Sequence, residues 1–328
     1  MSFLAPLVIG PLVIEPNICS APMAGYTDLP YRLVARALGG VGLAYTELIS
    51  CHALRRIGRT TRILMATAPP DAPLGMQVFG SDPAVMAAGA TVLEHAGAAL
   101  IDINMGCPVS KVAKTGGGAI LMCDPGRAEA IVSACVAAVK IPVTVKIRAG
   151  WDDQTRNACD FARRMADAGA AAIAVHARTR AQGYSGQADW PLIALAVKAV
   201  SVPVIGNGDV VNGPSAAALF AQTGCAAIMI GRAAMGAPWL FRSVHHYLAS
   251  GSELPPPEPA ERGALAWSHF LHMCEVYGEH TACLHIRRIS CAYARGLPGA
   301  RDFRTRAVHV ASAAEVKDVL CSFFGAPR

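Results

Sequence analysis

Eight short apolar segments, separated by helix-like stretches, constrain the fold of this chain most strongly. Each is apolar at successive positions rather than at alternate ones, which is typical of parallel strands covered on both faces. We expect strands at Ile18–Met23, Leu43–Glu47, Leu74–Val78, Leu100–Asn104, Val143–Ile147, Ala172–His176, Val204–Gly206 and Ala227–Ile230. Eight strand–helix units in about 250 residues predict an α/β fold, the (β/α)8 TIM barrel.

The stretches between these strands predict helices, and one segment, Cys51–Pro70, is expected to be irregular. The expected helices are Leu29–Leu38, Pro83–His95, Gly126–Val139, Asn157–Ala168, Leu192–Ala199 and Pro214–Gln222. A doubly wound open sheet is the alternative, but no G-x-G-x-x-G turn follows the first strand. Polar residues also stand at or just after the carboxyl ends of many strands, as a barrel site requires: Gln77, Asn104, Lys146, His176, Asn207 and Arg232.

The pattern changes at residues 251–259 (GSELPPPEP), which contain four prolines. They predict a stiff linker between a barrel domain, residues 1–250, and a small all-α helical-bundle domain, residues 260–328. Expected helices in the second domain are Ala260–Gly278, His280–Ala294 and Ala307–Phe324. Between His280 and Val310, six arginines face one acid, a local net charge of 6 − 1 = +5. Such a cluster fits either a nucleic-acid partner or an ordinary solvated helix face.

Composition excludes several classes of protein. Hydrophobic residues make up 53% of the chain and charged residues 16%, which argues against disorder. The eleven cysteines form no C-x-x-C pair, so we expect no metal site and no disulfide framework, and a reducing cytoplasm as the location. Pro6, Pro11 and Pro16 interrupt the N-terminal apolar stretch, so we expect neither a signal peptide nor a membrane span.

The loop after the fourth strand, residues 103–108 (INMGCP), carries a thiol. Cys107 alone could equally be a buried structural cysteine. Asn104 offers both a donor and an acceptor, which suits the edge of a pyrimidine. Because the sequence places no histidine base beside Cys107, the loop favours a protonated thiol that acts as an acid over a thiolate nucleophile.

Later strand ends offer groups for a charged cofactor. Lys146 ends the fifth strand, where a buried ammonium needs an anionic or electron-rich partner such as a reduced flavin, unless the side chain simply reaches solvent. Asn207-Gly208-Asp209 and Gly231-Arg232 follow strands seven and eight, where this barrel binds phosphate groups.

The sixth strand ends in HARTR, residues 176–180. His176 could contact the cofactor, or it could be a satisfied core histidine. Arg178 could contact the substrate. Tyr184, in the following loop, could stack on a base or be an ordinary loop aromatic.

Taken in order, these motifs resemble the tRNA-dihydrouridine synthase family, and its bacterial B-type branch most, over nearly the whole chain. The matching segments are APMAGYTDLPYR, MQVFGSDP, DINMGCP, VKIRAGW, HARTR, NGD and MIGRAAMGAPW. DINMGCP followed by KVAKTGGGAIL is specific to the family in this order, although Gly118 stands where the family often has serine.

The resemblance implies FMN as cofactor and NADPH as reductant. Residues implied to contact FMN are Pro22, Met23, Ala24, Gln77, Lys146, His176, Asn207, Gly208, Asp209, Gly231 and Arg232. Residues implied to contact tRNA are Asn104, Arg178 and Tyr184 at the target base and Arg287 and Arg288 in the helical domain. Hydride would pass from the flavin to C6 of a D-loop uridine, for which the branch suggests position 17, and Cys107 would protonate C5. A monomer is expected.

Two alternatives remain open. A small-molecule flavin-dependent pyrimidine reductase, similar to dihydroorotate dehydrogenase, would share the flavin and the proton donor but would not need the basic helical tail. A non-catalytic RNA-binding barrel predicts that site residues are missing, yet Gln77, Cys107, Lys146, His176 and Asn207 are all present.

Overall fold

A parallel sheet forms the centre of the computed structural model, which describes residues 3–325. Its strands follow the order β3-β11-β10-β9-β8-β7-β6-β4, with β5 also paired to β6, and a parallel bridge from Cys19 to Leu43 nearly closes the ring. The strands are β3 (Ile18–Ser20), β4 (Ala44–Tyr45), β5 (Ile49–Ser50), β6 (Leu74–Phe79), β7 (Leu100–Met105), β8 (Val143–Arg148), β9 (Ala172–His176), β10 (Val204–Asn207) and β11 (Ala227–Ile230). The predicted barrel is confirmed.

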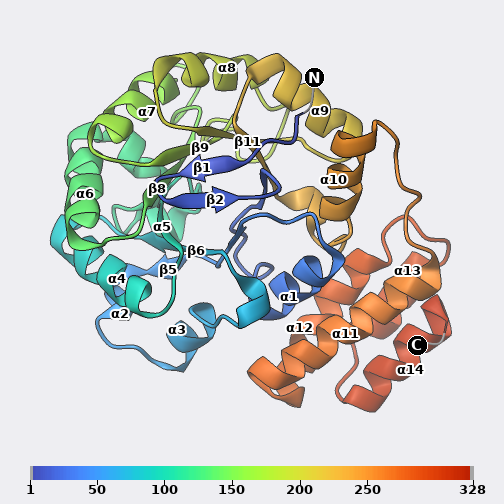
Figure 1. Cartoon of the computed structure of the whole chain (residues 1–328). Helices are drawn as coiled ribbons and strands as arrows, with labels where there is room; N and C mark the ends of the chain where they lie inside the picture. The colour runs from blue at the N-terminus through green and yellow to red at the C-terminus, as the bar shows by residue number, and fades with distance from the viewer. Residues whose placement is uncertain (1–2, 326–328) are drawn as a thin grey trace.

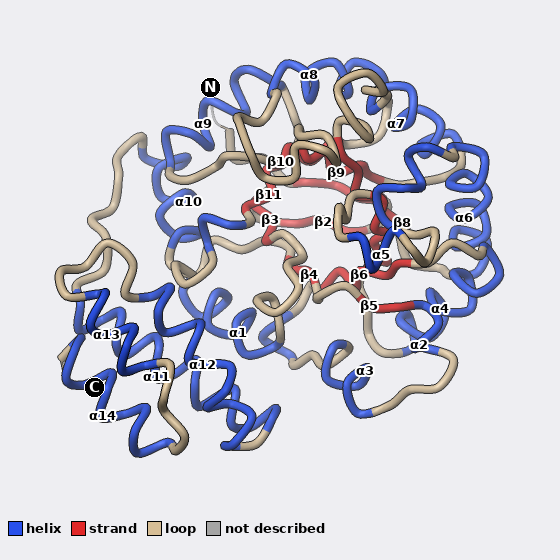
Figure 2. Tube along the Cα trace, turned by 180° about the vertical axis from the view of Figure 1, so that it is seen from behind, coloured by secondary structure: helices blue, strands red, loops and turns tan. Residues whose placement is uncertain are grey.

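Helices surround the sheet (Figure 1). The outer layer contains α1 (Leu29–Leu38), α2 (Cys51–Leu54), α3 (Arg59–Leu64), α4 (Pro83–His95), α6 (Pro125–Ala138), α7 (Ala158–Asp167), α8 (Trp190–Ala199), α9 (Gly213–Thr223) and α10 (Leu240–Ser250). The short helix α5 (Ser110–Ala113) lies in the loop after β7, inside this ring of helices (Figure 2). Asp28, Asp82 and Asp124 start α1, α4 and α6, where each carboxylate accepts a bond from the backbone N–H three residues on and a proline follows in the first turn.

The amino-terminal end of the barrel is covered by a hairpin that the sequence did not predict. β1 (Leu7–Ile9) pairs with β2 (Leu12–Ile14) in antiparallel fashion across this end (Figure 1). Leu7, Ile9 and Ile14 are buried against side chains of the barrel interior. The cavity that could bind a ligand is therefore at the other end, where the strands have their carboxyl termini.

Four helices follow the barrel and form a second core: α11 (Pro259–Tyr277), α12 (Glu279–Tyr293), α13 (Ala300–Ala307) and α14 (Ala313–Phe324). The expected helix Ala307–Phe324 is wrong at its start, because the Ser312 hydroxyl accepts a bond from the Glu315 N–H and begins a new helix there. The bundle packs against α1, where the Tyr277 hydroxyl donates to Asp28 over 2.8 Å.

Two further expectations need correction. The segment expected to be irregular contains α2, α3 and a 3-10 turn at Pro69–Asp71, and α10 follows the last strand although no helix was predicted there. Arg32, on α1, holds this segment by donating to Asp71 and to the carbonyl oxygen of Ala66. The segment is therefore ordered by a distant charged residue, which local sequence patterns do not reveal.

Candidate functional site

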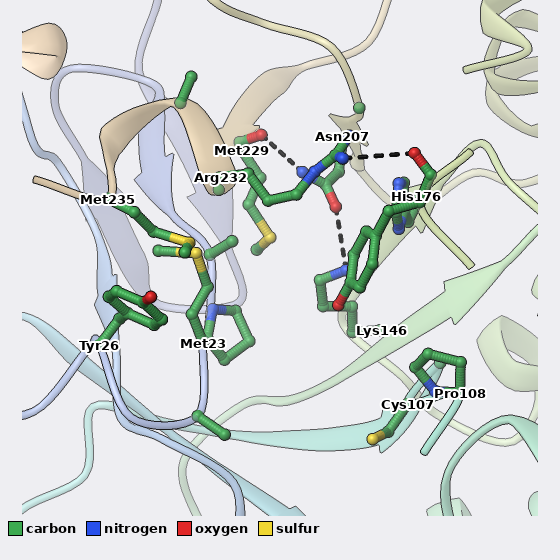
Figure 3. A pocket seen from close by; sticks show the side chains of 18 of the residues that line it. Met23, Tyr26, Cys107, Pro108, Lys146, His176, Asn207, Met229, Arg232 and Met235 are labelled. Carbon is green, nitrogen blue, oxygen red and sulfur yellow. Dashed lines mark hydrogen bonds between the residues drawn. The ribbon is translucent and has the colours of Figure 1, made fainter. Parts of the chain in front are cut away.

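A cavity of about 710 Å³ opens at the carboxyl ends of the barrel strands. All but three of the residues predicted for the site line it. The lining includes Pro22, Met23, Ala24, Gln77, Asn104, Cys107, Lys146, His176, Tyr184, Asn207, Gly208, Asp209, Gly231 and Arg232. Figure 3 shows Cys107, Lys146 and His176 along one side of the cavity and Met23, Tyr26 and Met235 along the other. The strand ends thus bring together residues that lie far apart in the sequence.

A chain of hydrogen bonds leads from the barrel interior to the thiol loop. The Gln77 amide nitrogen donates to Asp102 over 2.6 Å, and the Gln77 carbonyl oxygen accepts from the Asn104 amide over 2.8 Å. The Asn104 oxygen accepts from the backbone N–H of Cys107 over 2.8 Å. An ionised carboxylate can only accept, so Asp102 sets the orientation of both amides. Burial raises the pKa of Asp102 to about 6, against the opposing effect of its bonds from Gln77 and Thr144.

Lys146 and His176 face the cavity in defined protonation states. The Lys146 ammonium donates to the Asn207 side-chain oxygen over 3.0 Å, and the Asn207 amide donates to the Met229 carbonyl oxygen over 2.7 Å. Burial, and then the neighbouring Arg148, lower the pKa of Lys146 to about 8. Burial and four surrounding cations lower the pKa of His176 to about 2. At neutral pH the cavity therefore presents a charged lysine and a neutral imidazole.

Arg178 is one of the three predicted residues that do not line the cavity. Its side chain is 2% exposed, and its guanidinium donates to both carboxylate oxygens of Asp209 over 2.8 and 2.7 Å. Arg232 reaches the same carboxylate over 3.3 Å. Asp209 therefore joins the buried Arg178 to the half-exposed Arg232 at the cavity edge. Arg178 lies behind Asp209 and positions its carboxylate.

The sequence reasoning missed Arg148, although it lines the cavity. Its guanidinium donates to the Gly106 carbonyl oxygen over 2.7 Å and lies 5.4 Å from the centre of the Tyr184 ring. The Arg232 guanidinium also lies close to that ring, 4.9 Å from its centre. Because side chains alternate along a strand, Arg148 shares a face with Lys146 two residues earlier, and this spacing could have identified it.

The helical bundle contributes to the cavity mouth. Arg295, which the sequence reasoning did not assign to the site, lines the cavity, and so does Tyr26. Arg288 lies 4.3 Å from the centre of the Tyr26 ring and donates to the Gly25 carbonyl oxygen. Arg287 instead donates to the Val310 carbonyl oxygen within the bundle. Of the two predicted arginines, only Arg288 is near the cavity.

The donor set suits a flat ring with a polar edge and an anionic tail. Apolar residues line one part of the wall, whereas amides, an ammonium and a guanidinium line the rest. Gly231 lines the cavity beside Ala21 and Met23, where a Cβ would be in ordinary contact with the Ala21 Cβ at 3.4 Å and the Met23 sulfur at 3.7 Å. Gly208 has a φ of +131°, which favours glycine. The residues present therefore fit FMN.

Residues 3–325 contain no group of three or more His, Cys, Asp or Glu side chains arranged to hold a metal ion. Over the same range, no helix combines the length and hydropathy that a membrane span needs.

Comparisons with known proteins show the family to which the chain belongs. Residues 19–325 match the family model described as "Dihydrouridine synthase (Dus)". The chain is 40% identical over 298 residues to tRNA-dihydrouridine synthase B of Pseudomonas aeruginosa, covering 91% of this chain and 90% of the relative. It is 42% identical over 297 residues to the synthase B of Xanthomonas campestris, covering 90% of this chain and 89% of the relative. It is 38% identical over 315 residues to a probable tRNA-dihydrouridine synthase 1 of Synechocystis, covering 96% and 88%.

Among solved structures, a 2-naphthoyl-CoA reductase complex superposes with a TM-score of 0.58 at 12% sequence identity. The match covers 74% of this chain and 52% of that chain. At this identity the likeness concerns the fold alone.

Proposed function

We propose a cofactor, a proton donor and a substrate position for this chain, which belongs to the dihydrouridine synthase family and is a flavin-dependent tRNA-dihydrouridine synthase. The flavin is FMN, NADPH is the reductant, and the substrate is a D-loop uridine of tRNA. The observation that carries the proposal is the Cys107 thiol, which lines the same cavity as the amide, ammonium and glycine groups suited to FMN.

The residues fall into three groups around the proposed FMN. Pro22, Met23 and Ala24 would lie against its ring, and Gln77, Lys146 and His176 would contact its polar edge. Its phosphate-bearing tail would be held by Asn207, Gly208, Asp209, Gly231 and Arg232. When bound and reduced, FMN supplies the hydride for C6 of uracil.

Cys107 supplies the other hydrogen. The thiol gives its proton to C5 of uracil, so the pyrimidine gains a hydride and a proton and loses its C5=C6 double bond. Asn104 holds the loop through the Cys107 N–H, which fixes the thiol relative to the cavity. A proton from solvent then restores the thiol for the next turnover.

The charges around the thiol fit this role. Lys146 stays protonated at neutral pH and stabilises negative charge that develops nearby, while neutral His176 donates or accepts a hydrogen bond without competing for that charge. Arg148 and Tyr184 line the cavity on the same side and are available to the substrate base, with Asn104.

We further propose a division of labour between barrel residues 1–250 and helical residues 260–328, joined by the proline-rich segment 251–259. The barrel carries the chemistry, and the helical part binds tRNA. Taking a uridine out of its stack costs a few kcal/mol. Phosphate contacts from exposed arginines such as Arg288, Arg295 and Arg304 offset this cost in a salt-dependent way.

The decisive experiment compares Cys107→Ala with Cys123→Ala. Cys123 is exposed and does not line the cavity, so it is a matched control. Loss of a general acid lowers the rate by about 10² to 10⁴-fold. We expect Cys107→Ala to retain FMN and to oxidise NADPH, but to form dihydrouridine at a rate lower by that factor, while Cys123→Ala behaves as wild type. Dihydrouridine formed at the wild-type rate by Cys107→Ala would refute the assignment, and activity on free uridine in place of tRNA would favour a small-molecule reductase.

A further inference from the structure

We propose that the arginines of the α2–α3 segment, Arg55, Arg56, Arg59 and Arg62, form a second surface that binds tRNA phosphates, on the barrel itself. This inference rests on the proposed tRNA substrate and adds a surface outside the helical domain, where the sequence had suggested the tRNA contacts. The partner class is the sugar–phosphate backbone of the same tRNA whose uridine enters the cavity.

The charge of this segment is unbalanced. Residues 48–70 contain these four arginines and no acid, a net charge of 4 − 0 = +4. All four side chains are exposed, and none takes part in an ion pair within residues 3–325. Like charges placed this close together repel each other, and a polyanion removes that repulsion while releasing its own counterions.

The two acids that flank the segment in the sequence, Glu47 and Asp71, do not neutralise it because they have other partners. Asp71 is fully buried and pairs with Arg32 over 2.8 Å. The half-buried Glu47 accepts the backbone N–H of Gly25 over 2.7 Å. The positive charge of the arginines therefore remains available to a ligand from outside the chain.

The segment lies on the same side of the barrel as the cavity. α2 begins directly after the carboxyl end of β5, and Leu48, just before β5, lines the cavity. Arg59 donates to the Tyr277 carbonyl oxygen over 3.3 Å, which places α3 against the end of α11 (Figure 2). The segment therefore adjoins the helical bundle at the end of α11, where Glu275 pairs with His272 and Glu279 accepts the backbone N–H of Ala313.

The cavity mouth continues this surface. Arg288, on α12, covers Tyr26 at the cavity edge, and Arg295 lines the cavity itself. A tRNA with one base in the cavity would meet cations from the bundle on one side of the mouth. The α2–α3 arginines supply cations to a strand that leaves the mouth toward α3.

The way the arginines are spread along the segment favours the sugar–phosphate backbone of a nucleic acid as the ligand over a small anion. The four arginines are spread over eight residues, from the turn after α2 into α3, and none of them lines the cavity at the strand ends. Exposed, flexible arginines bind phosphates along a strand without a shaped pocket. The NADPH phosphates, the other anions that the enzyme meets, would require a more enclosed site.

The test uses the triple variant Arg55→Gln/Arg56→Gln/Arg62→Gln, which leaves Arg59 to contact Tyr277. The control Lys140→Gln/Arg163→Gln/Lys198→Gln removes the same charge from exposed positions on the α6–α8 side of the barrel (Figure 1). Each lost phosphate contact lowers the slope of log K against log salt by about 0.7 to 0.9. We expect the slope for tRNA to fall by roughly 2 to 3, and the affinity at 0.1 M salt to fall by about tenfold or more, only in the α2–α3 variant.

Three results would decide the matter. An Arg→Lys version of the triple variant should keep the wild-type slope, which shows that charge rather than folding is responsible. A slope equal to that of the α6–α8 control would overturn the proposal, and so would a raised KM for NADPH with unchanged tRNA affinity. Because binding is measured without turnover, this failure is distinct from failure of the Cys107 test.

Discussion

Lys146 allows a prediction whose size follows from the structure. Lys146 is 9% exposed, and burial lowers its pKa from 10.5 to about 8. At 1.36 kcal/mol per unit, the buried charge costs the FMN-free protein about 3 kcal/mol at pH 7. Lys146→Met removes this cost but also removes the bond to Asn207, which is worth about 1 kcal/mol. We expect the variant to be more stable than wild type by about 2 kcal/mol.

The sign of the pH dependence follows from linkage. Below pH 8 the lysine is protonated in both the folded and the unfolded state, so the cost is fully present. Between pH 8 and 10.5 the folded state loses the proton while the unfolded state keeps it, so wild-type stability rises with pH. By pH 9.5 wild type regains about 2 kcal/mol, and the advantage of Lys146→Met disappears.

Thermal unfolding of the FMN-free proteins measures this effect. With an unfolding entropy of about 2.1 cal/mol/K per residue, 2 kcal/mol corresponds to roughly 3 °C in Tm for this chain. We expect Lys146→Met to unfold about 3 °C higher than wild type at pH 7 and at the same temperature at pH 9.5. The control Lys198→Met, at an exposed position, should show no such crossing. A constant difference between pH 7 and 9.5 would refute the argument.

The same lysine should control FMN affinity. An anionic partner keeps Lys146 protonated, so binding above pH 8 requires uptake of a proton. We expect wild-type affinity for FMN, followed by the quenching of flavin fluorescence, to fall by up to about tenfold per pH unit above pH 8. Lys146→Met should bind FMN more weakly at pH 7 and without this dependence. Parallel pH profiles for the two proteins would show that Lys146 does not contact the flavin.

Three further substitutions test other parts of the structure. Asp71→Asn should lower the free energy of unfolding by about 3 to 5 kcal/mol in urea titrations, because it leaves the buried Arg32 charge without its partner. A loss of less than about 1 kcal/mol would contradict this. Asp102→Leu should reduce FMN affinity about tenfold by removing the acceptor that orients Gln77, whereas full flavin content after dialysis would argue against that role. Arg288→Gln should weaken tRNA binding in filter assays without reducing flavin content, and an unchanged salt dependence would count against a phosphate contact.

The sequence determined the strands and the order of the site residues along the chain. In a parallel barrel every strand ends at the same face, so Asn104, Lys146 and Asn207 had to meet once the strands were identified. The specific motif around Cys107 likewise indicated the family before any geometry was known. The strand positions and the family motif could both be predicted because each depends only on residues close together in the sequence.

The tertiary structure decided which polar side chains face the cavity and which hold the loops behind it. Arg148 is the last residue of β8 and Arg178 lies two residues after β9, yet a counterion from a different loop, Asp209, holds Arg178 in the packed interior, while Arg148 lines the cavity. The α2–α3 helices are likewise ordered through Arg32, which lies on another element. Such outcomes depend on partners distant in the chain, because a buried charge must find its counterion in space rather than in sequence.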